Sequence, residues 1–252
     1  MRNIKLLIAF DGTAYSGWQR QKGPPTIQGV LEDRIALMTG GSVTLHGAGR
    51  TDAGVHALGM VANFHTTAKI PCQGFMKGLN SLLPDDIKIL GLEDAPAGFH
   101  ARFSAHGKTY LYQAITAPVI MPVKRLYYSH FPGEFNLSRM NEALALLIGE
   151  HDFSSFEAAG SRDPRIKRGR GAVRKIFAVG VAPLIDDNGF MVTIHGDGFL
   201  RHMVRNIVGT LVEVGSGKKN IDNFAEILYC RDRFAAGATA LACGLFLREI
   251  FY

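Results

Sequence analysis

Runs of apolar residues, continuous or alternating with polar ones, predict a series of short strands along the chain. Residues 4–10 have the pattern of a buried strand that ends at an Asp-Gly turn. The Asp-Asn-Gly sequence at 187–189 predicts a tight turn that joins two antiparallel strands. Strands are expected at 4–10, 43–48, 60–64, 87–92, 108–117, 173–183, 190–194 and 245–251.

Apolar residues at helical spacing predict five helices between these strands. Thr26 is expected to cap the first helix, which ends at Gly40. The helices are expected at 27–39, 71–83, 137–149, 200–214 and 221–228. Because the strands occur in clusters rather than in regular alternation with helices, the pattern favours the α+β class.

Length and composition set the scale of the fold. The chain has 252 residues, of which 47% are hydrophobic and 20% charged, which is typical of one large or two modest globular domains. Pro118 and Pro122 interrupt the pattern after the strand at 108–117. This interruption predicts an N-terminal half at 1–117 and a C-terminal half at 118–252.

The basic residues are concentrated in one segment. The stretch RDPRIKRGRGAVRK at 162–175 holds seven Lys or Arg and one Asp, which leaves 21 basic and 21 acidic residues elsewhere. Its glycines and proline predict a loop. Such a segment is suited to nucleic acid, since each cation near a phosphate releases counterions, although a solvated loop is an alternative.

Several classes of protein and site are disfavoured. Three widely spaced cysteines indicate neither a disulfide framework nor a zinc knuckle, and no apolar run is long enough to span a membrane. A cytoplasmic protein is therefore expected. The sequence GSGKK at 215–219 lacks the leading glycine and the Ser or Thr of a phosphate-binding loop. The sequences GAG at 47–49 and GDG at 196–198 both lack the third glycine of a dinucleotide site.

One block of the sequence carries candidate chemistry. In GAGRTDAGVHA at 47–57, glycines flank Arg50 and Asp52, so that the backbone could approach a ligand closely while presenting a carboxylate. Such an Asp can act as nucleophile or base. The alternative is a turn in which Asp52 hydrogen-bonds the local backbone.

This block, with DGTAYSGWQ at 11–19, resembles the paired signature of the tRNA pseudouridine(38-40) synthase family, the A-type pseudouridine synthases. The resemblance continues in order through NSLLPDDI (80–87), FHARFSA (99–105), KTYLY (108–112), GEHDFSSF (149–156), GFLRHMVRNIVGT (198–210) and residues 235–247. It implies a central antiparallel sheet with flanking helices, in two similarly built halves that form a positively charged cleft.

The resemblance also implies roles for individual residues. Asp52 would be the catalytic carboxylate, Arg205 the basic residue that pairs with it, Tyr110 the aromatic ring that stacks on the uracil, and Arg50 a residue that positions the target nucleotide. Contacts with tRNA are expected at Phe99, His100, Ala101, Arg102, Phe103, Gly160, Ser161 and Arg162, and along the basic segment at Arg165, Lys167, Arg168 and Arg170.

Structural alternatives exist for these residues. Tyr110 could be a core residue that shares a strand face with Tyr112, and either Phe99 or Phe103 could be core. Arg205 lies in an otherwise apolar helix, where a buried guanidinium needs a carboxylate partner, so its functional role is favoured.

The activity implied by the resemblance is isomerisation of uridine to pseudouridine at positions 38, 39 and 40 in the anticodon stem-loop of tRNA, by a homodimer. No cofactor, metal or membrane is expected. A noncatalytic RNA-binding or chaperone protein of the same fold is the main alternative. A metal-dependent hydrolase that uses Asp52, His56 and His65 is disfavoured, because their spacing matches no known ligand pattern.

Overall fold

The computed structural model describes residues 1–161, 169–185 and 187–252. It divides into two compact units, unit 1 (residues 1–106 and 246–252) and unit 2 (residues 107–245). The division precedes strand β5 (Gly107–Ile115), whereas the sequence pattern predicts a boundary after residue 117. The reason is that β5 pairs along its whole length with β9 (Gly189–Gly196) of unit 2. Tyr110, on β5, therefore belongs to the same unit as Arg205.

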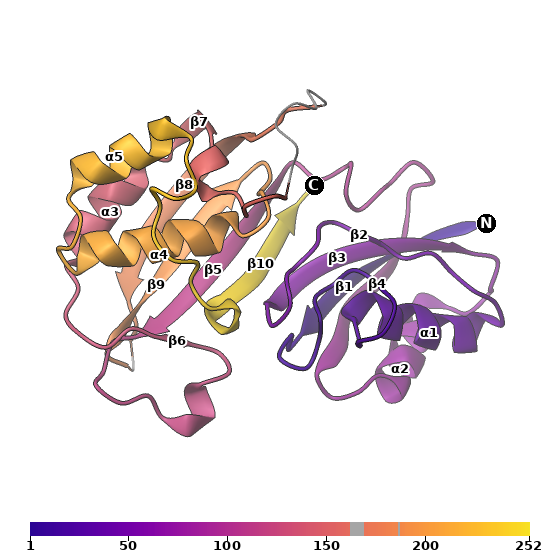
Figure 1. The fold of residues 1–252 in the computed structure, drawn as a ribbon. Helices are drawn as coiled ribbons and strands as arrows, with labels where there is room; N and C mark the ends of the chain where they lie inside the picture. The colour runs from indigo at the N-terminus through magenta and orange to yellow at the C-terminus, as the bar shows by residue number, and fades with distance from the viewer. Residues whose placement is uncertain (162–168, 186) are drawn as a thin grey trace. The chain divides into compact units, whose positions relative to one another are not determined.

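Unit 1 is built on a sheet with the strand order β4-β1-β3-β10, and β2 pairs with β3 (Figure 1). Its strands are β1 (Arg2–Phe10), β2 (His46–Gly47), β3 (His56–Thr66), β4 (Ile87–Ala95) and β10 (Leu245–Phe251). In the antiparallel register of β1 and β3, Ile4 lies opposite Phe64 and Ile8 opposite Met60. All four side chains are fully buried, so this pairing forms the centre of the core.

Two helices pack in unit 1, α1 (Ile27–Thr39) and α2 (Cys72–Leu82), with α2 along β4 and against α1. The expected ends of α1 are confirmed. The Thr26 side chain accepts a hydrogen bond from the backbone N–H of Gly29, and Gly40 ends the helix in the left-handed conformation at φ 75°.

Unit 2 has the strand order β5-β9-β8-β7, and β6 pairs with β5. The remaining strands are β6 (Ser129–His130), β7 (Gly149–Asp152) and β8 (Val173–Pro183). Along β9, every second residue is buried, as expected for a strand with one face on the core.

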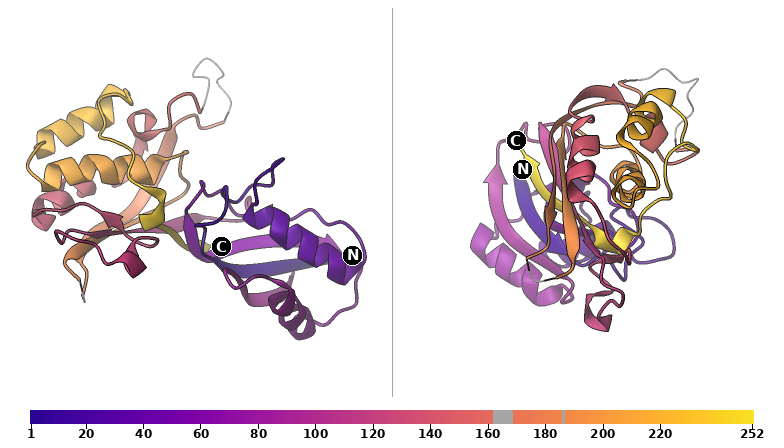
Figure 2. Two further views of the ribbon diagram at one scale, coloured as in Figure 1. Left: turned by 60° about the horizontal axis from the view of Figure 1, so that its bottom comes forward. Right: turned by 90° about the vertical axis from the view of Figure 1, so that its left-hand side faces the viewer.

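Three helices gather on one side of the unit 2 strands β8 and β9 (Figure 2). They are α3 (Leu137–Ala145), α4 (Met203–Gly215) and α5 (Ile221–Cys230). The helix predicted at 137–149 ends earlier, because Gly149 adopts a φ of 108° at the start of β7. Short 3-10 helices span Pro122–Lys124, Ser154–Phe156 and Ala242–Gly244.

The predicted α+β class is confirmed, since each unit packs helices against a sheet. The sheet is mixed rather than purely antiparallel, because β10 runs parallel to β3 and β6 runs parallel to β5. Within the described ranges, no helix combines the length and the apolar character needed to cross a membrane.

Candidate active site

The two signature blocks of the sequence pack backbone against backbone in unit 1. A Cβ on Gly12 would lie 2.0 Å from the carbonyl oxygen of Val55, and a Cβ on Gly17 would lie 2.5 Å from that of Thr51. Gly17 also has a φ of 87°, which disfavours any side chain there. The N–H of Trp18 donates to the Thr51 carbonyl at 3.1 Å. These glycines therefore allow the loop with Asp52 to sit directly on the 11–19 segment.

Asp52 lies in this loop between β2 and β3, with its side chain half-buried. Its carbonyl accepts from the Val55 N–H at 3.2 Å, so the backbone makes the expected turn. The neighbouring Thr51 hydroxyl is buried and has no hydrogen-bond partner in the described part of the chain. The loop thus holds a carboxylate and an unsatisfied hydroxyl side by side in the sequence.

A relay of amides orients Arg50. Its Nε donates to Gln19 Oε1 at 2.9 Å, and Gln19 Nε2 donates to Gln28 Oε1 at 2.6 Å. Gln28 is buried on α1 and donates in turn to the Leu45 carbonyl and to Glu32 Oε1. Glu32 also accepts from the Leu45 N–H at 3.0 Å. The exposed guanidinium therefore rests on a buried polar network.

The surroundings of His56 indicate a structural role for this side chain. The side chain is buried, its ring stacks on Phe246 with centroids 4.7 Å apart, and Nδ1 accepts from the Gly12 N–H at 3.1 Å. No group of three His, Cys, Asp or Glu side chains that could hold a metal ion occurs among the residues that the structure describes.

In unit 2, Tyr110 and Tyr112 have different environments. The Tyr112 ring is fully buried, and its hydroxyl hydrogen-bonds Ser129 Oγ at 2.5 Å and the Leu241 carbonyl at 2.9 Å. Burial raises the pKa of Tyr112. Tyr110 instead meets Phe199 edge to face, with ring centroids 4.9 Å apart. Both tyrosines are therefore buried, Tyr112 completely and with its hydroxyl bonded in the core, and Tyr110 against Phe199 of the GFLRHMVRNIVGT motif.

Arg205 lies half-buried in the first turn of α4. Its Nε donates to the Ala240 carbonyl at 2.7 Å, and the Ala240 N–H donates to the Arg205 carbonyl at 3.1 Å. The segment that holds Ala240 fits closely on α4, because a Cβ on Gly209 would lie 1.8 Å from the Ala238 carbonyl oxygen. Side-chain direction at Arg205 is therefore set by this segment.

The expected RNA-contacting residues at 99–103 form a loop in unit 1. Ala101 is fully buried, with its N–H donating to Asn63 Oδ1 and its carbonyl accepting from the Tyr252 hydroxyl. Phe99 packs on the Tyr252 ring at 5.0 Å, whereas Phe103 is 78% exposed. Ala101 and Phe99 thus fix the loop, and Phe103 projects from it.

The basic segment is described only from residue 169 onward. Arg162, Arg165, Lys167 and Arg168 lie outside the described residues. Arg170 forms an ion pair with Asp197 and lies beside Gly198, the residue that precedes Phe199 in the sequence. Before the segment, Gly160 has a φ of 68° and Ser161 donates to Glu157 at 2.9 Å.

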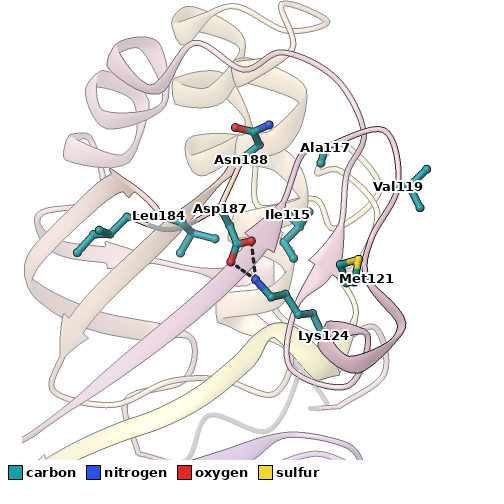
Figure 3. A pocket seen from close by; sticks show the side chains of 9 residues that line it. Ile115, Ala117, Val119, Met121, Lys124, Leu184, Asp187 and Asn188 are labelled. Carbon is teal, nitrogen blue, oxygen red and sulfur yellow. Dashed lines mark hydrogen bonds and ion pairs between the residues drawn. The ribbon is translucent and has the colours of Figure 1, made fainter.

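A cavity of about 540 Å³ lies elsewhere in unit 2 (Figure 3). Its apolar lining includes Ile115, Met121 and Leu184, and a Lys124–Asp187 ion pair lies at its centre, with Nζ 2.5 Å from each carboxylate oxygen. Among the described residues, no candidate site residue lines it.

The sequence matches the tRNA pseudouridine synthase family over residues 6–104 and 143–252. The chain belongs to this family. It is 51% identical over 252 residues to tRNA pseudouridine synthase A 1 of Desulfotalea psychrophila and 46% identical over 252 residues to tRNA pseudouridine synthase A of Geotalea uraniireducens. It is 43% identical over 255 residues to tRNA pseudouridine synthase A 2 of Clostridium tetani. Each alignment covers the whole chain and 99% or more of the relative.

The structure places two further residues at the candidate site of this tRNA pseudouridine synthase, and neither was expected from the sequence. Gln19 holds Arg50, and Phe199 contacts Tyr110. Both lie inside motifs that carry the family resemblance, so their position in those motifs was the available signal.

Proposed function

We propose that the protein converts uridine to pseudouridine at positions 38, 39 and 40 in the anticodon stem-loop of tRNA, with Asp52 as the catalytic carboxylate. Its family membership makes it an isomerase that acts on tRNA uridines. The observation that carries the assignment to Asp52 is the glycine-dependent packing of the 11–19 segment on the 47–57 loop, which fixes the backbone on both sides of this carboxylate.

The reaction breaks the bond between N1 of uracil and C1′ of ribose, rotates the base, and forms a bond from C5 to C1′. The C5 proton is lost and N1 takes up a proton, so the product is an isomer of the substrate and no electron donor or acceptor is needed. Asp52 could add to C6, attack C1′, or remove a ribose proton, and each route requires an ionised carboxylate. A carboxylate held by a preorganised loop is suited to any of the three.

Tyr110 and Arg205 complete the proposed machinery. A uracil taken out of its stack needs an aromatic surface, and Tyr110 is the KTYLY ring that lies against Phe199 of the GFLRHMVRNIVGT motif. Arg205 is proposed to pair with the Asp52 carboxylate during the reaction. Arg205→Met should therefore lower turnover more than Arg205→Lys does, because lysine keeps the positive charge.

The tRNA-binding surface is proposed to include the 99–103 loop, residues 160–162 and the basic segment, and the active species is proposed to be a homodimer. Because phosphate contacts release counterions, substitution of Arg170 by Gln should weaken tRNA binding and lower its dependence on salt. Sedimentation of the full chain should give the mass of a dimer.

The proposed activity is tested by release of tritium from a tRNA transcript labelled at uridine C5. Wild type, Asp52→Asn and the control Asp85→Asn are compared in EDTA; Asp85 is an exposed aspartate of the same unit that pairs with Lys88 at 3.2 Å. We expect wild type and Asp85→Asn to release tritium and Asp52→Asn to release none. Equal release by Asp52→Asn would remove this carboxylate from the chemistry, and binding of tRNA without release by wild type would favour the noncatalytic RNA-binding protein.

A further inference from the structure

Three side chains from two distant parts of the sequence bring their rings together in unit 1. The His46 and His100 ring centroids are 4.9 Å apart with an interplanar angle of 38°, and those of His100 and Phe103 are 4.4 Å apart at 33°. The Arg102 guanidinium lies 5.9 Å from the Phe103 ring centroid. We call His46, His100 and Phe103 the ring stack. It is a continuous series of flat side chains that ends in an exposed ring and a cation.

The ring stack stands on a rigid base. Asn63 of β3 is fully buried, and its amide accepts from the Ala101 N–H at 2.9 Å and donates to Asn3 Oδ1 at 2.9 Å. Asn3, also buried, donates to the carbonyls of Pro96 and Phe99. These bonds hold the loop at both ends of residues 96–101. An exposed phenylalanine on a loop fixed in this way loses little conformational entropy when a ligand covers it.

The environment of His100 favours an uncharged ring. Burial lowers the pKa of His100, and the nearby His46, Arg102 and His65 lower it further. The Arg102 N–H also donates to His100 Nδ1 at 3.1 Å, which requires an unprotonated nitrogen at that position. At neutral pH the middle ring of the stack is therefore uncharged, and the positive charge beside the stack comes from Arg102.

Such a combination is suited to an unpaired nucleobase. Every base has a flat π face that stacks on aromatic side chains, and a neighbouring arginine can meet the phosphate that accompanies it. His46 immediately precedes the glycine-flanked loop that holds Asp52, so the stack adjoins the proposed catalytic loop along the chain.

We propose that the ring stack of His46, His100 and Phe103 binds an unpaired base of the tRNA other than the uridine that reacts, and that His46 contributes to RNA binding through its ring. This proposal rests on the proposed function and assigns a role to His46, a residue outside the signature blocks. A base stacked here would anchor the anticodon loop while the target uridine is turned out.

The test measures binding of a tRNA transcript to the full-length protein as a function of salt concentration. The variants are His46→Ala, His46→Phe, Phe103→Ala and Arg102→Gln, with His65→Ala as the matched control, an exposed histidine of the same unit that is not part of the ring stack. Circular dichroism spectra that match wild type establish that each variant is folded.

Loss of a stacking ring should weaken binding by about five- to a hundred-fold without changing the salt slope, because no phosphate contact is lost. His46→Ala and Phe103→Ala should show this loss, His46→Phe and His65→Ala should bind like wild type, and Arg102→Gln should reduce the slope by about one. Wild-type affinity in His46→Ala, equal losses in His46→Ala and His46→Phe, or a reduced slope in His46→Ala would each overturn the proposal.

Failure of the ring stack is distinguishable from failure of the proposed function. If wild type releases tritium from labelled tRNA and His46→Ala keeps full affinity, only the ring-stack proposal is wrong. If wild type binds tRNA with the expected dependence on His46 but releases no tritium, the ring stack is supported and the proposed isomerase activity is wrong.

Discussion

Replacing a helical glycine by alanine is predicted to have opposite effects on stability at Gly209 and at Gly74, because only Gly209 packs closely against another segment of the chain. Gly209 of α4 faces the Ala238 backbone, and an added Cβ would lie 1.8 Å from the carbonyl oxygen and 3.0 Å from its carbon. At Gly74 of α2, no atom of the described residues outside the helix's own backbone lies within 4 Å of the same position. Because both glycines lie in helices, alanine gains about 1 kcal/mol of helix propensity at either position.

At Gly209 this gain is exceeded by the cost of the contact. Overpacking costs about 1–3 kcal/mol, and more where the obstacle is backbone that cannot rotate away. Displacement of the segment would also loosen the bond from the Gly237 N–H to Thr210 Oγ1 and the bond from Arg233 to Asn206 Oδ1. We expect Gly209→Ala to lower the free energy of unfolding by about 2 kcal/mol and Gly74→Ala to raise it by about 0.5–1 kcal/mol.

Urea denaturation followed by far-ultraviolet circular dichroism measures both changes, and it samples both units, unlike fluorescence of the single tryptophan, Trp18 of unit 1. The tritium-release activity of Gly209→Ala should also fall, since the displaced segment includes the Ala240 carbonyl that holds Arg205 Nε. A Gly209→Ala protein as stable as Gly74→Ala would refute the reasoning, because helix propensity alone would then explain both results.

Three further predictions concern unit 1. Glu32→Ala should lower the free energy of unfolding by about 1–3 kcal/mol in urea denaturation, because the Leu45 N–H is left buried without its acceptor; Glu32→Gln should lose less. Thr51→Val should raise the melting temperature, since it replaces a buried hydroxyl that has no partner within the described residues by a methyl group of similar shape; a lower value would show that the hydroxyl is satisfied in solution. Because the pKa of His100 is lower in the folded chain, the unfolded chain binds more protons, so stability should fall as the pH drops below about 6.5, and His100→Gln should show a weaker fall.

Local sequence chemistry predicted the elements whose ends are set by their own residues. Thr26 and Gly40 bound α1 because a cap and a left-handed glycine act within one turn of the helix. Two elements whose extent depends on a partner were missed or given the wrong bounds. The four-residue strand β7 is polar at its centre and exists because it pairs with β8. The strand expected at 43–48 is reduced to His46–Gly47, the two residues in antiparallel register with β3.

The same distinction applies to the site. The sequence pointed to Asp52 through its glycine-rich block, and the structure shows that Gly12 and Gly17 of the 11–19 segment allow that segment to approach the backbone of Val55 and Thr51. The ring stack could not be predicted, because His46 and Phe103 lie 57 positions apart and no periodicity links them. Their proximity depends on the pairing of β2 with β3 and on the buried Asn63 amide.

Buried amides support three of the proposed functional groups in this protein. Gln28 supports the relay that holds Arg50, Asn63 fixes the loop that presents Phe103, and Asn206 accepts from Arg233 in the segment that directs Arg205. A buried amide both donates and accepts, so it can fix two backbone segments at once, and leaving either bond unmade is costly. An enzyme whose proposed chemistry uses only its own side chains must position them within a fraction of an ångström. Substitution of these amides should therefore impair turnover even though none of them is proposed to touch the reacting atoms.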